Sequence, residues 1–462
     1  MNRNRRPLLL LALLLALPAL PELRSAIKPY YGGEIVIRLN EPSSFHLNTA
    51  NYSNLIFYSL IHESFFYLKK DGEITSNVFQ EFRYDAAART LFLTLKDNLS
   101  FSNGKPLTAR NIQVSLKVFM TSDLFVASRL SKAVKRVHIL DERVAIELLA
   151  DHPDILSLLT APELVVLAES EQSFSGLFYP QEWEKGRHMI LRANPHYAGG
   201  RPYLDRVRVT FSDKPAPDLF LSAPGQFRDH CLEFTSGIYQ NVYLCFLQPD
   251  IGQNTKIALY SLLKRFNEAT GGRFRDLNSL TSDDESPIAI RIKQFSPQKT
   301  ASILKTSEIK LYALSSLSSM EKDLSAFLSD TRLKIETQFI DNGEFTSFLD
   351  SAAIKYVLID KIFQKKSPAE EKISRIVKES SFNRFNAQYL RMLSELDEAR
   401  FSNSQELLIE QIARISEAVV NDGFIFPLFQ KSYSLYVRKS WPELEIDYFG
   451  RPLLQRVSQG NE

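Results

Sequence analysis

The second half of the chain alternates between helical and strand patterns, and this alternation constrains the fold more than any other feature of the sequence. Helical periodicity recurs in TKIALYSLLKRFNEA, TASILKT, EKDLSAFLSD and QELLIEQIARISEAVV. Short strand patterns lie between them, in EIKLYAL, LKIETQFI and IKYVLID. Strands that alternate with helices usually pair in parallel, because each helix crosses back over the sheet. The sequence therefore predicts a partly parallel sheet with helices on its faces.

The region before Lys256 is richer in strands. Alternation of apolar and polar residues predicts strands in GEIVIRL, LFLTLK, MILRANPHY and DRVRVTF. RVHIL and RVAIEL are predicted to form a hairpin around Asp141-Glu142, and NIQVSLKVFM is predicted to form a helix. FIFPLFQKSYSLYV returns to strand near the end. With 462 residues, the chain is long enough for two or three domains, and its class is α/β.

The N-terminus has the pattern of a secretory signal peptide. Three arginines precede the apolar run LLLLALLLALPAL, which Pro18 interrupts. The run is too short to span a bilayer comfortably. We expect residues 1–26 to be the signal, with Ala19 and Ala26 as candidate cleavage positions; an uncleaved membrane anchor is the alternative. Because no cysteine follows the run, N-terminal lipid attachment is not expected, and the predicted location is the periplasm.

The charge balance argues against nucleic acid as a partner. The 56 basic and 54 acidic residues give a net charge of +2, and removal of the three leader arginines leaves −1. Binding to nucleic acid requires a clustered basic face. A near-neutral chain offers no sign of one.

The only two cysteines, Cys231 and Cys245, lie in the segment CLEFTSGIYQNVYLC. Both sides of Ser236-Gly237 alternate, so the segment could fold into a hairpin centred near Ile238 and bring the two sulfurs together. An exported protein meets an oxidising compartment. A disulfide and a pair of small buried residues are both open interpretations.

Motifs that carry chemistry are missing from the sequence. None of the seven histidines forms an HExxH pair or another close metal-binding spacing, and there is no CxxC. Phosphate-binding glycine loops and a GxSxG elbow are absent as well. We therefore predict no catalytic residue, no metal ligand and no enzyme activity. An enzyme of unfamiliar type is the alternative, because a pair of catalytic carboxylates is defined in space.

Several longer stretches resemble the extracellular solute-binding proteins of the peptide/nickel type. In RTLFLTLKDNLSFSNGKPLTARNIQVSL, as in that family, a strand and an aromatic residue are followed by Gly-x-Pro-Leu-Thr-Ala and a helix. GLFYPQEWEKGRHMILRANPHYAGGRPYLDRVRVTF is similar to the family's aromatic pair, tryptophan strand, Asn-Pro-x-Tyr turn and Leu-Asp-x-Val strand. YLCFLQPD, SPQKTASIL and FIFPLFQKSYSLYV follow in family order. The resemblance runs from about Gly32 to about Val457.

The resemblance implies a two-lobed periplasmic-binding-protein fold, or Venus flytrap, with an extra N-terminal subdomain. In such proteins, two lobes joined by crossing strands close over a solute, which must bind the closed state better than the open one. The expected division is lobe I at residues 32–45, 160–241 and 430–462, the extra subdomain of lobe I at 46–159, and an α/β lobe II at 242–429.

The function implied by the resemblance is the exported binding component of an ABC importer. It would capture peptides or a similar extended polar solute as a monomer, without a cofactor, and deliver them to an inner-membrane permease. The alternative is a degenerate relative that binds a protein partner in the periplasm without transport. A missing tryptophan and the short, proline-rich segment SDKPAPDLFLSAPGQFRDH motivate this alternative.

The resemblance also nominates a ligand carboxylate. Peptide binders of the family place an aspartate of a Trp-x-x-Asp stretch against the ligand's ammonium group, and KYVLIDKIFQKKSP would put Asp360 there. Val357 stands in place of the tryptophan. The alternative is an exposed acidic residue at a strand end, paired with Lys361 or Lys365.

Further ligand contacts are expected in two segments that would face the cleft by resemblance. They follow the first strand and the C-terminal strand, and the residues are Phe45, His46, Asn48, Phe429, Gln430 and Tyr433. For each of them, a packing role is the alternative. A nickel ligand set is not expected, because no histidine cluster is visible.

Overall fold

The computed structural model describes residues 31–45, 52–122, 125–152, 155–168, 170, 172–212, 216–221, 230–248, 250–270, 274–280, 292–305, 307–340, 354–365, 369–379, 387–401, 405–441 and 443–458. The predicted signal peptide lies outside these ranges, as do His46 and Asn48. Within them, no helix combines the length and the apolar character that crossing a membrane requires.

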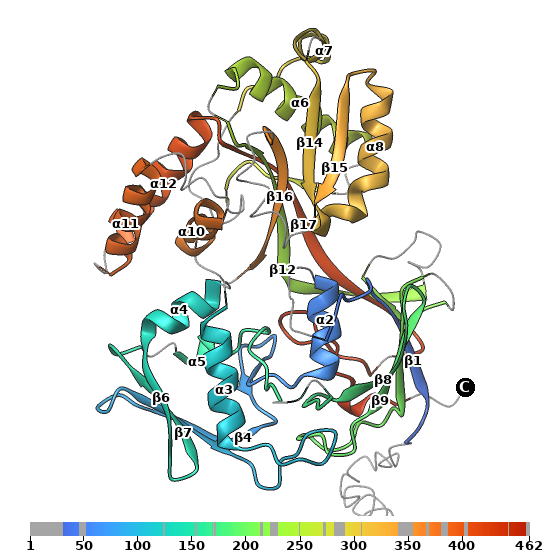
Figure 1. Cartoon of the computed structure of the whole chain (residues 1–462), viewed down its shortest axis with the longest axis vertical. Helices are drawn as coiled ribbons and strands as arrows, with labels where there is room; N and C mark the ends of the chain where they lie inside the picture. Colours follow the sequence, from blue (N-terminus) through green and yellow to red (C-terminus); the bar gives the residue numbers. More distant parts are fainter. Residues whose placement is uncertain are drawn as a thin grey trace, which may run out of the picture.

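A sheet of 11 strands extends from the upper part of the molecule into the lower part (Figure 1). Its strands, in spatial order, are β15 (Ile335–Ile340), β14 (Ile309–Leu314), β16 (Tyr356–Gln364), β12 (Cys231–Phe246), β17 (Ile425–Arg438), β11 (Leu219–Phe220), β1 (Glu34–Arg38), β10 (Arg206–Thr210), β9 (His188–Ala193) and β8 (Phe178–Glu184). The short β13 (Arg275–Asp276) pairs with β17 outside this order. β14 lies parallel to both β15 and β16, so the predicted partly parallel sheet is confirmed.

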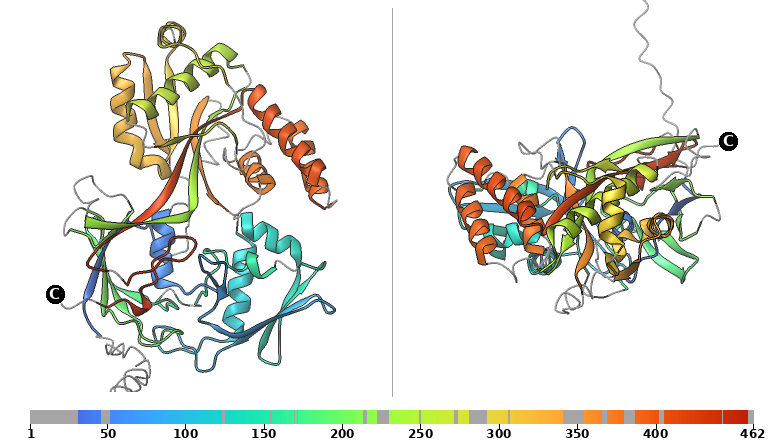
Figure 2. Two further views of the ribbon diagram at one scale, coloured as in Figure 1. Left: turned by 180° about the vertical axis from the view of Figure 1, so that it is seen from behind. Right: turned by 90° about the horizontal axis from the view of Figure 1, so that it is seen from above.

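The long strands β12 and β17 connect two groups of elements. In Figures 1 and 2 they run side by side from the upper group, which holds α6, α7, α8, β14 and β15, into the lower group, which holds α2, β1, β8 and β9. The two strands pair antiparallel along most of their length, from the pair Cys231 and Arg438 to the pair Cys245 and Ile425. The two groups are therefore joined by a hydrogen-bonded ribbon of 16- and 14-residue strands.

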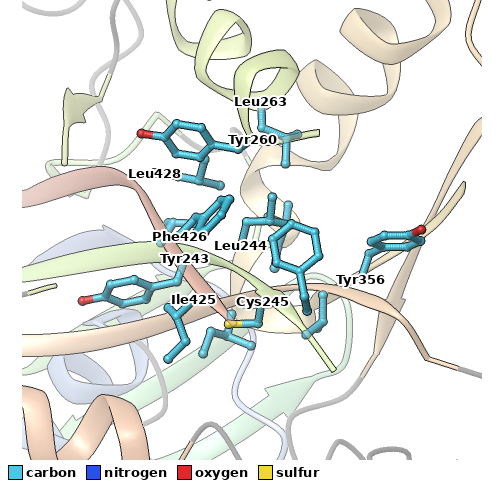
Figure 3. Close-up of a cluster of buried hydrophobic side chains, with 14 of the residues drawn as sticks. Tyr243, Leu244, Cys245, Tyr260, Leu263, Tyr356, Ile425, Phe426 and Leu428 are labelled. Carbon is cyan, nitrogen blue, oxygen red and sulfur yellow. The ribbon is translucent and has the colours of Figure 1, made fainter. Parts of the chain in front are cut away.

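Helices cover the upper part of the sheet. They are α6 (Gln253–Ala269), α7 (Pro297–Leu304), η2 (Ser315–Met320), α8 (Glu321–Asp330), α10 (Ala369–Glu379), α11 (Ala387–Phe401) and α12 (Gln405–Asn421). Their apolar faces and the strands between them form one hydrophobic cluster, which we call the upper core. Figure 3 shows part of it, where Tyr243, Leu244 and Cys245 of β12 meet Phe426 of β17 and Tyr260 of α6.

The lower group has a core of its own. The lower core contains α2 (Tyr52–Ile61), the inward-facing residues of β1, β8, β9 and β10, the second half of β17 and the tail from Trp441 to Val457. All described side chains of α2 except Ser59 are buried, because the helix is covered on every side.

A third hydrophobic cluster surrounds a separate four-stranded sheet. This sheet has the order β4 (Phe79–Asp85), β5 (Thr90–Leu95), β7 (Arg143–Leu148) and β6 (Val134–Leu140), with α3 (Ala109–Met120), α4 (Phe125–Ala133) and α5 (Ile155–Leu158). The small hairpin β2 (Tyr67–Leu68) and β3 (Ile74–Thr75) precedes it. The predicted β6–β7 hairpin is confirmed, and Asp141 and Glu142 at its turn both have positive φ.

The predicted hairpin between the two cysteines is wrong. Residues Cys231 to Phe246 form one strand, so the sulfurs lie at opposite ends of it, on the order of 40 Å apart at the usual rise per residue. Both thiols are free. Ser236 and Gly237 form a bulge instead of a turn, since the register against β17 shifts between Thr235 and Tyr239.

Candidate functional site

Three neighbouring strands pass from the lower core to the upper core, and each carries a polar residue at the transition. In β12, Ile238 belongs to the lower core and Val242 to the upper core. Gln240 lies between them on the same side of the strand, because side chains two residues apart share a face.

The same pattern occurs in the two strands beside β12. Lys431 of β17 lies between Tyr433, which belongs to the lower core, and Phe429, which belongs to the upper core. In β16, Asp360 lies in the middle of the strand and is followed two residues later by Ile362, which packs against the lower core.

The pairing register places these polar residues on one face of the sheet. Gln240 lies opposite Lys431 in β17 and opposite Ile362 in β16, and Asp360 shares the face of Ile362. We call Gln240, Asp360 and Lys431 the polar band.

Hydrogen bonds link Gln240 and Asp360 of the polar band to each other and to two neighbouring hydroxyl groups. Gln240 donates from Nε2 to Asp360 Oδ2 at 2.6 Å, and its Oε1 accepts from the Tyr433 hydroxyl at 2.8 Å. The Ser316 hydroxyl of η2 donates to Asp360 Oδ1. Asp360 and Gln240 are both buried. Burial raises the pKa of Asp360, and the hydrogen bonds from Ser316 and Gln240 oppose that shift.

The network touches elements of both cores. Ser316 comes from the upper group, whereas the ring of Tyr52, from α2 of the lower core, lies 4.6 Å from the ring of Tyr433. The Tyr52 hydroxyl donates to the Gly450 carbonyl at 2.9 Å. The polar band is thus flanked by η2 of the upper group and by α2 of the lower group.

Lys431 is the cationic member of the band. It is half-buried, and its Nζ lies 5.6 Å from the centre of the Tyr433 ring. Burial lowers the pKa of Lys431. No acidic side chain in the described ranges makes an ion pair with it.

The structure brings together only some of the predicted site residues. Asp360 and Tyr433 both bind Gln240, so they form one site. Asp360 is buried in the middle of β16, which differs from an exposed acid at a strand end. Gln430 lies on the opposite face of the sheet, where its Nε2 donates to Asn241 Oδ1 at 3.1 Å.

The two predicted phenylalanines are packing residues in this structure. Phe429 is buried in the upper core, where its ring stacks on Phe274 with centres 5.7 Å apart. Phe45 packs against the lower core and lies 5.2 Å from the ring of Trp183 and 5.8 Å from that of Phe174. We therefore leave both out of the candidate site.

Sequence reasoning missed Gln240, Lys431, Ser316 and Tyr52. One signal was present in the segment GIYQNVYLCF, where Gln240 and Asn241 interrupt an otherwise apolar strand. A buried amide side chain usually has a hydrogen-bonding partner. The partners themselves lie more than 70 residues away and depend on the sheet register.

A second polar cluster is buried near α2. Glu63 accepts hydrogen bonds from the Tyr67 hydroxyl at 3.1 Å and from Asn77 Nδ2 at 3.2 Å. Burial raises the pKa of Glu63 to about 7, against the effect of its hydrogen-bond donors. Burial lowers the pKa of the neighbouring His62 to about 4. Over the described ranges, no group of three or more His, Cys, Asp or Glu residues is arranged to hold a metal ion.

Comparison with known proteins finds a family match over part of the chain. Residues 73–234 match the family described as bacterial extracellular solute-binding proteins, family 5, middle region. The nickel-binding protein NikA of Staphylococcus aureus is 24% identical over 158 residues, which are 33% of this chain and 32% of that protein. The curated relatives are each matched over less than a third of their own length.

Similarity to solved structures extends over nearly the whole chain. The oligopeptide-binding protein AppA from Bacillus subtilis, in complex with a nonapeptide, has a TM-score of 0.69 at 13% identity, covering 94% of this chain and 100% of that one. The dipeptide-binding protein from Pseudoalteromonas sp. SM9913, in complex with Met-Leu, has a TM-score of 0.71 at 12% identity, covering 93% and 100%. At these identities the likeness shows the fold, which is the expected two-lobed α/β fold. The chain thus has this fold, and its residues 73–234 resemble the family 5 bacterial extracellular solute-binding proteins.

Proposed function

We propose that the chain captures a peptide or a similar extended polar solute between its two lobes and hands it to the membrane permease of an ABC importer. The match of residues 73–234 to a solute-binding family supports this role. Two relatives of the same fold hold a nonapeptide and the dipeptide Met-Leu. In this role the chain would act as a monomer and without catalysis.

The division into lobes is part of the proposal. Lobe I would comprise residues 32–45, 160–241 and 430–462, with the extra subdomain at 46–159, and lobe II would comprise residues 242–429. The upper core supports the boundaries of lobe II, since all its buried residues except Tyr239 come from residues 242–429. The lower core includes α2 (Tyr52–Ile61), which lies within the proposed extra subdomain. The exchange from lower to upper core occurs at Gln240 in β12 and at Lys431 in β17.

The location is likewise proposed from the family. Extracellular solute-binding proteins are exported, and residues 1–26 have the pattern of a signal peptide. We propose cleavage of this segment and a periplasmic mature protein.

One observation carries the proposed function: the carboxylate of Asp360 lies buried at the transition between the two cores. Burial of a carboxylate costs free energy unless hydrogen bonds or a counter-charge compensate. Two donors, Gln240 and Ser316, reach it from the protein. A carboxylate can accept about four hydrogen bonds. The ammonium group of a peptide would supply further donors and the missing positive charge.

The test begins with the full chain purified gently from the compartment to which it is exported. Native mass spectrometry followed by denaturation identifies any small molecule that it releases. We expect released peptides. With the released peptide as titrant, Asp360→Asn should bind at least tenfold more weakly, because one charge-assisted contact is lost. The matched control is Asp97→Asn, which removes an exposed carboxylate far along the chain, next to the separate four-stranded sheet.

Two results would contradict the proposal. A folded protein that releases nothing and shows no thermal shift with a peptide library is no peptide receptor. Co-purification of one protein in place of a small molecule would favour the partner-binding alternative instead. Unchanged affinity of Asp360→Asn for a released peptide would leave the receptor function standing and remove Asp360 from it.

A further inference from the structure

We propose that Lys431 binds an anionic group of the captured solute, so that the solute carries a negative charge as well as a positive one. This inference rests on the proposed function, and it deepens that function by naming the solute's charge pattern. The observation behind it is a half-buried lysine on the same face of the sheet as the Asp360 carboxylate.

Two other buried lysines, Lys256 and Lys264, are compensated by the protein itself. Lys256 donates to the Asp422 carbonyl at 3.3 Å. Lys264 donates to the carbonyls of Leu277 at 3.1 Å and Leu428 at 2.8 Å, and Asp276 lies 3.6 Å away. Each of these ammonium groups therefore recovers part of the hydration that it loses on burial.

Lys431 differs from both of them. Its contact in the described ranges is with the face of the Tyr433 ring, at 5.6 Å from the ring centre. A cation over an aromatic ring gains about 0.5–2 kcal/mol, less than a direct ion pair to a desolvated partner can supply. The residue is half-buried, so part of its side chain stays exposed. An anionic group on the solute would supply the counter-charge that no acidic side chain in the described ranges supplies to Lys431.

The spacing of the two charges limits the size of the solute. Asp360 lies opposite Val242, and Lys431 lies opposite Gln240, two residues earlier in β12. With strands about 4.8 Å apart and a rise of about 3.4 Å per residue, the Cα atoms of Asp360 and Lys431 are about 12 Å apart. A lysine side chain can shorten the gap between the charges to the length of a short peptide. A di- or tripeptide with free ends, ammonium toward Asp360 and carboxylate toward Lys431, fits this pattern.

The experiment uses three matched probe sets: di- and tripeptide mixtures with free ends, the same mixtures with amidated C-termini, and the same with acetylated N-termini. Binding is measured by equilibrium dialysis on the full mature chain and on Lys431→Met and Lys431→Arg. The wild type should bind the free peptides at least tenfold more tightly than the amidated ones. Lys431→Met should lose this preference, because it should bind the two sets with a free carboxyl end more weakly than the wild type does and the amidated set equally well. Lys431→Arg should keep the preference.

A purely structural role for Lys431 predicts a different result. Removal of a structural lysine would lower the unfolding temperature and weaken all three probe sets together. Under our inference, the unfolding temperature of ligand-free Lys431→Met should equal or exceed that of the wild type, because a poorly compensated charge has been removed from the interior.

The outcomes separate the two proposals. If Lys431→Met keeps the wild-type preference for free carboxyl ends, the inference is overturned while the receptor function stands. If folded wild type binds none of the probe sets, the peptide-receptor function and the role of Lys431 fail together. Equal binding of free and amidated peptides by the wild type would overturn the role of Lys431 alone.

Discussion

The side-chain amide of Gln240 bridges two residues that are far apart in the chain, donating to Asp360 at 2.6 Å and accepting from Tyr433 at 2.8 Å. Since all three side chains are buried, Gln240→Ala would leave the Tyr433 hydroxyl without its acceptor and Oδ2 of Asp360 without its donor, while Ser316 still donates to Oδ1. An unsatisfied buried polar group costs about 1–3 kcal/mol. We expect Gln240→Ala to lower the free energy of unfolding by about that amount, as measured by urea denaturation.

Tyr433→Phe is the matched comparison for this prediction. It removes one hydroxyl and keeps the ring, so the loss should be about 1 kcal/mol. The Asp360 carboxylate keeps its donors in this variant. Equal stability of Gln240→Ala and the wild type would contradict the bridging role.

The neighbours His62 and Glu63 should have opposite effects on stability as the pH changes. Burial raises the pKa of Glu63 from 4.5 to about 7, so between these values the folded state holds more protons than the unfolded one. Its contribution to the free energy of unfolding therefore falls by about 3 kcal/mol as the pH rises through this window. Burial lowers the pKa of His62 from 6.5 to about 4, so its contribution rises by about 3 kcal/mol as the pH rises from 4 to 6.5.

These two contributions nearly cancel between pH 4.5 and 6.5, and single substitutions should reveal them. Glu63→Gln should make the free energy of unfolding rise with pH relative to the wild type. His62→Gln should make it fall relative to the wild type. Urea denaturation at three pH values measures both slopes, and all other groups cancel in the comparison. If the free energy of unfolding depended on pH in the same way in the wild type and both variants, burial would not shift the pKa of Glu63 or His62.

Gly450 and Gly186 allow a test of close packing around Tyr52, beside the polar band. Both have positive φ, +80° and +76°, so alanine at either position meets the same backbone strain of about 1–2 kcal/mol. At Gly450 an added Cβ would overlap the Tyr52 hydroxyl and Ser236 Cβ, whereas at Gly186 nothing lies within 4 Å. Gly450→Ala should therefore cost about 1–3 kcal/mol more than Gly186→Ala in thermal or urea unfolding. A difference near zero would mean that the tail around Gly450 moves away freely.

The two thiols should react differently with an alkylating reagent. Cys245 is buried in the upper core and Cys231 is half-buried, and burial raises the pKa of both thiols. In the native protein, we expect labelling at Cys231 and protection at Cys245. After denaturation without reductant, mass spectrometry should find both labelled. Two unlabelled cysteines in the denatured, unreduced protein would reveal a disulfide.

Local periodicity was enough to predict much of the fold. The parallel strands β14, β15 and β16, the helices α6, α8 and α12, and the β6–β7 hairpin all follow patterns that span fewer than 20 residues. Such patterns are visible in one sequence because each element buries one face.

The failures involve contacts between distant segments. Ser236-Gly237 resembles a turn, but the Gly237 N–H donates to the Tyr448 carbonyl at 2.8 Å, and the Tyr448 ring fills the space where a Cβ would lie. The chain therefore continues as a strand past a bulge. Asp360 could be nominated by resemblance, whereas its bond to Gln240 depends on the register of two strands 120 residues apart. That register is a property of the whole sheet.

The paired strands β12 and β17 also have a mechanical consequence. They stay hydrogen-bonded to each other from the lower core into the upper core, apart from the irregularities at Thr235–Tyr239 and Val242–Tyr243. A change in the angle between the lobes must then bend and twist this ribbon, since neither strand can slide along the other without breaking its ladder. Such a deformation is elastic and reversible, and it is easiest at the two bulges. The stiffness of two short stretches of backbone would therefore set how far the lobes can turn and how readily they return.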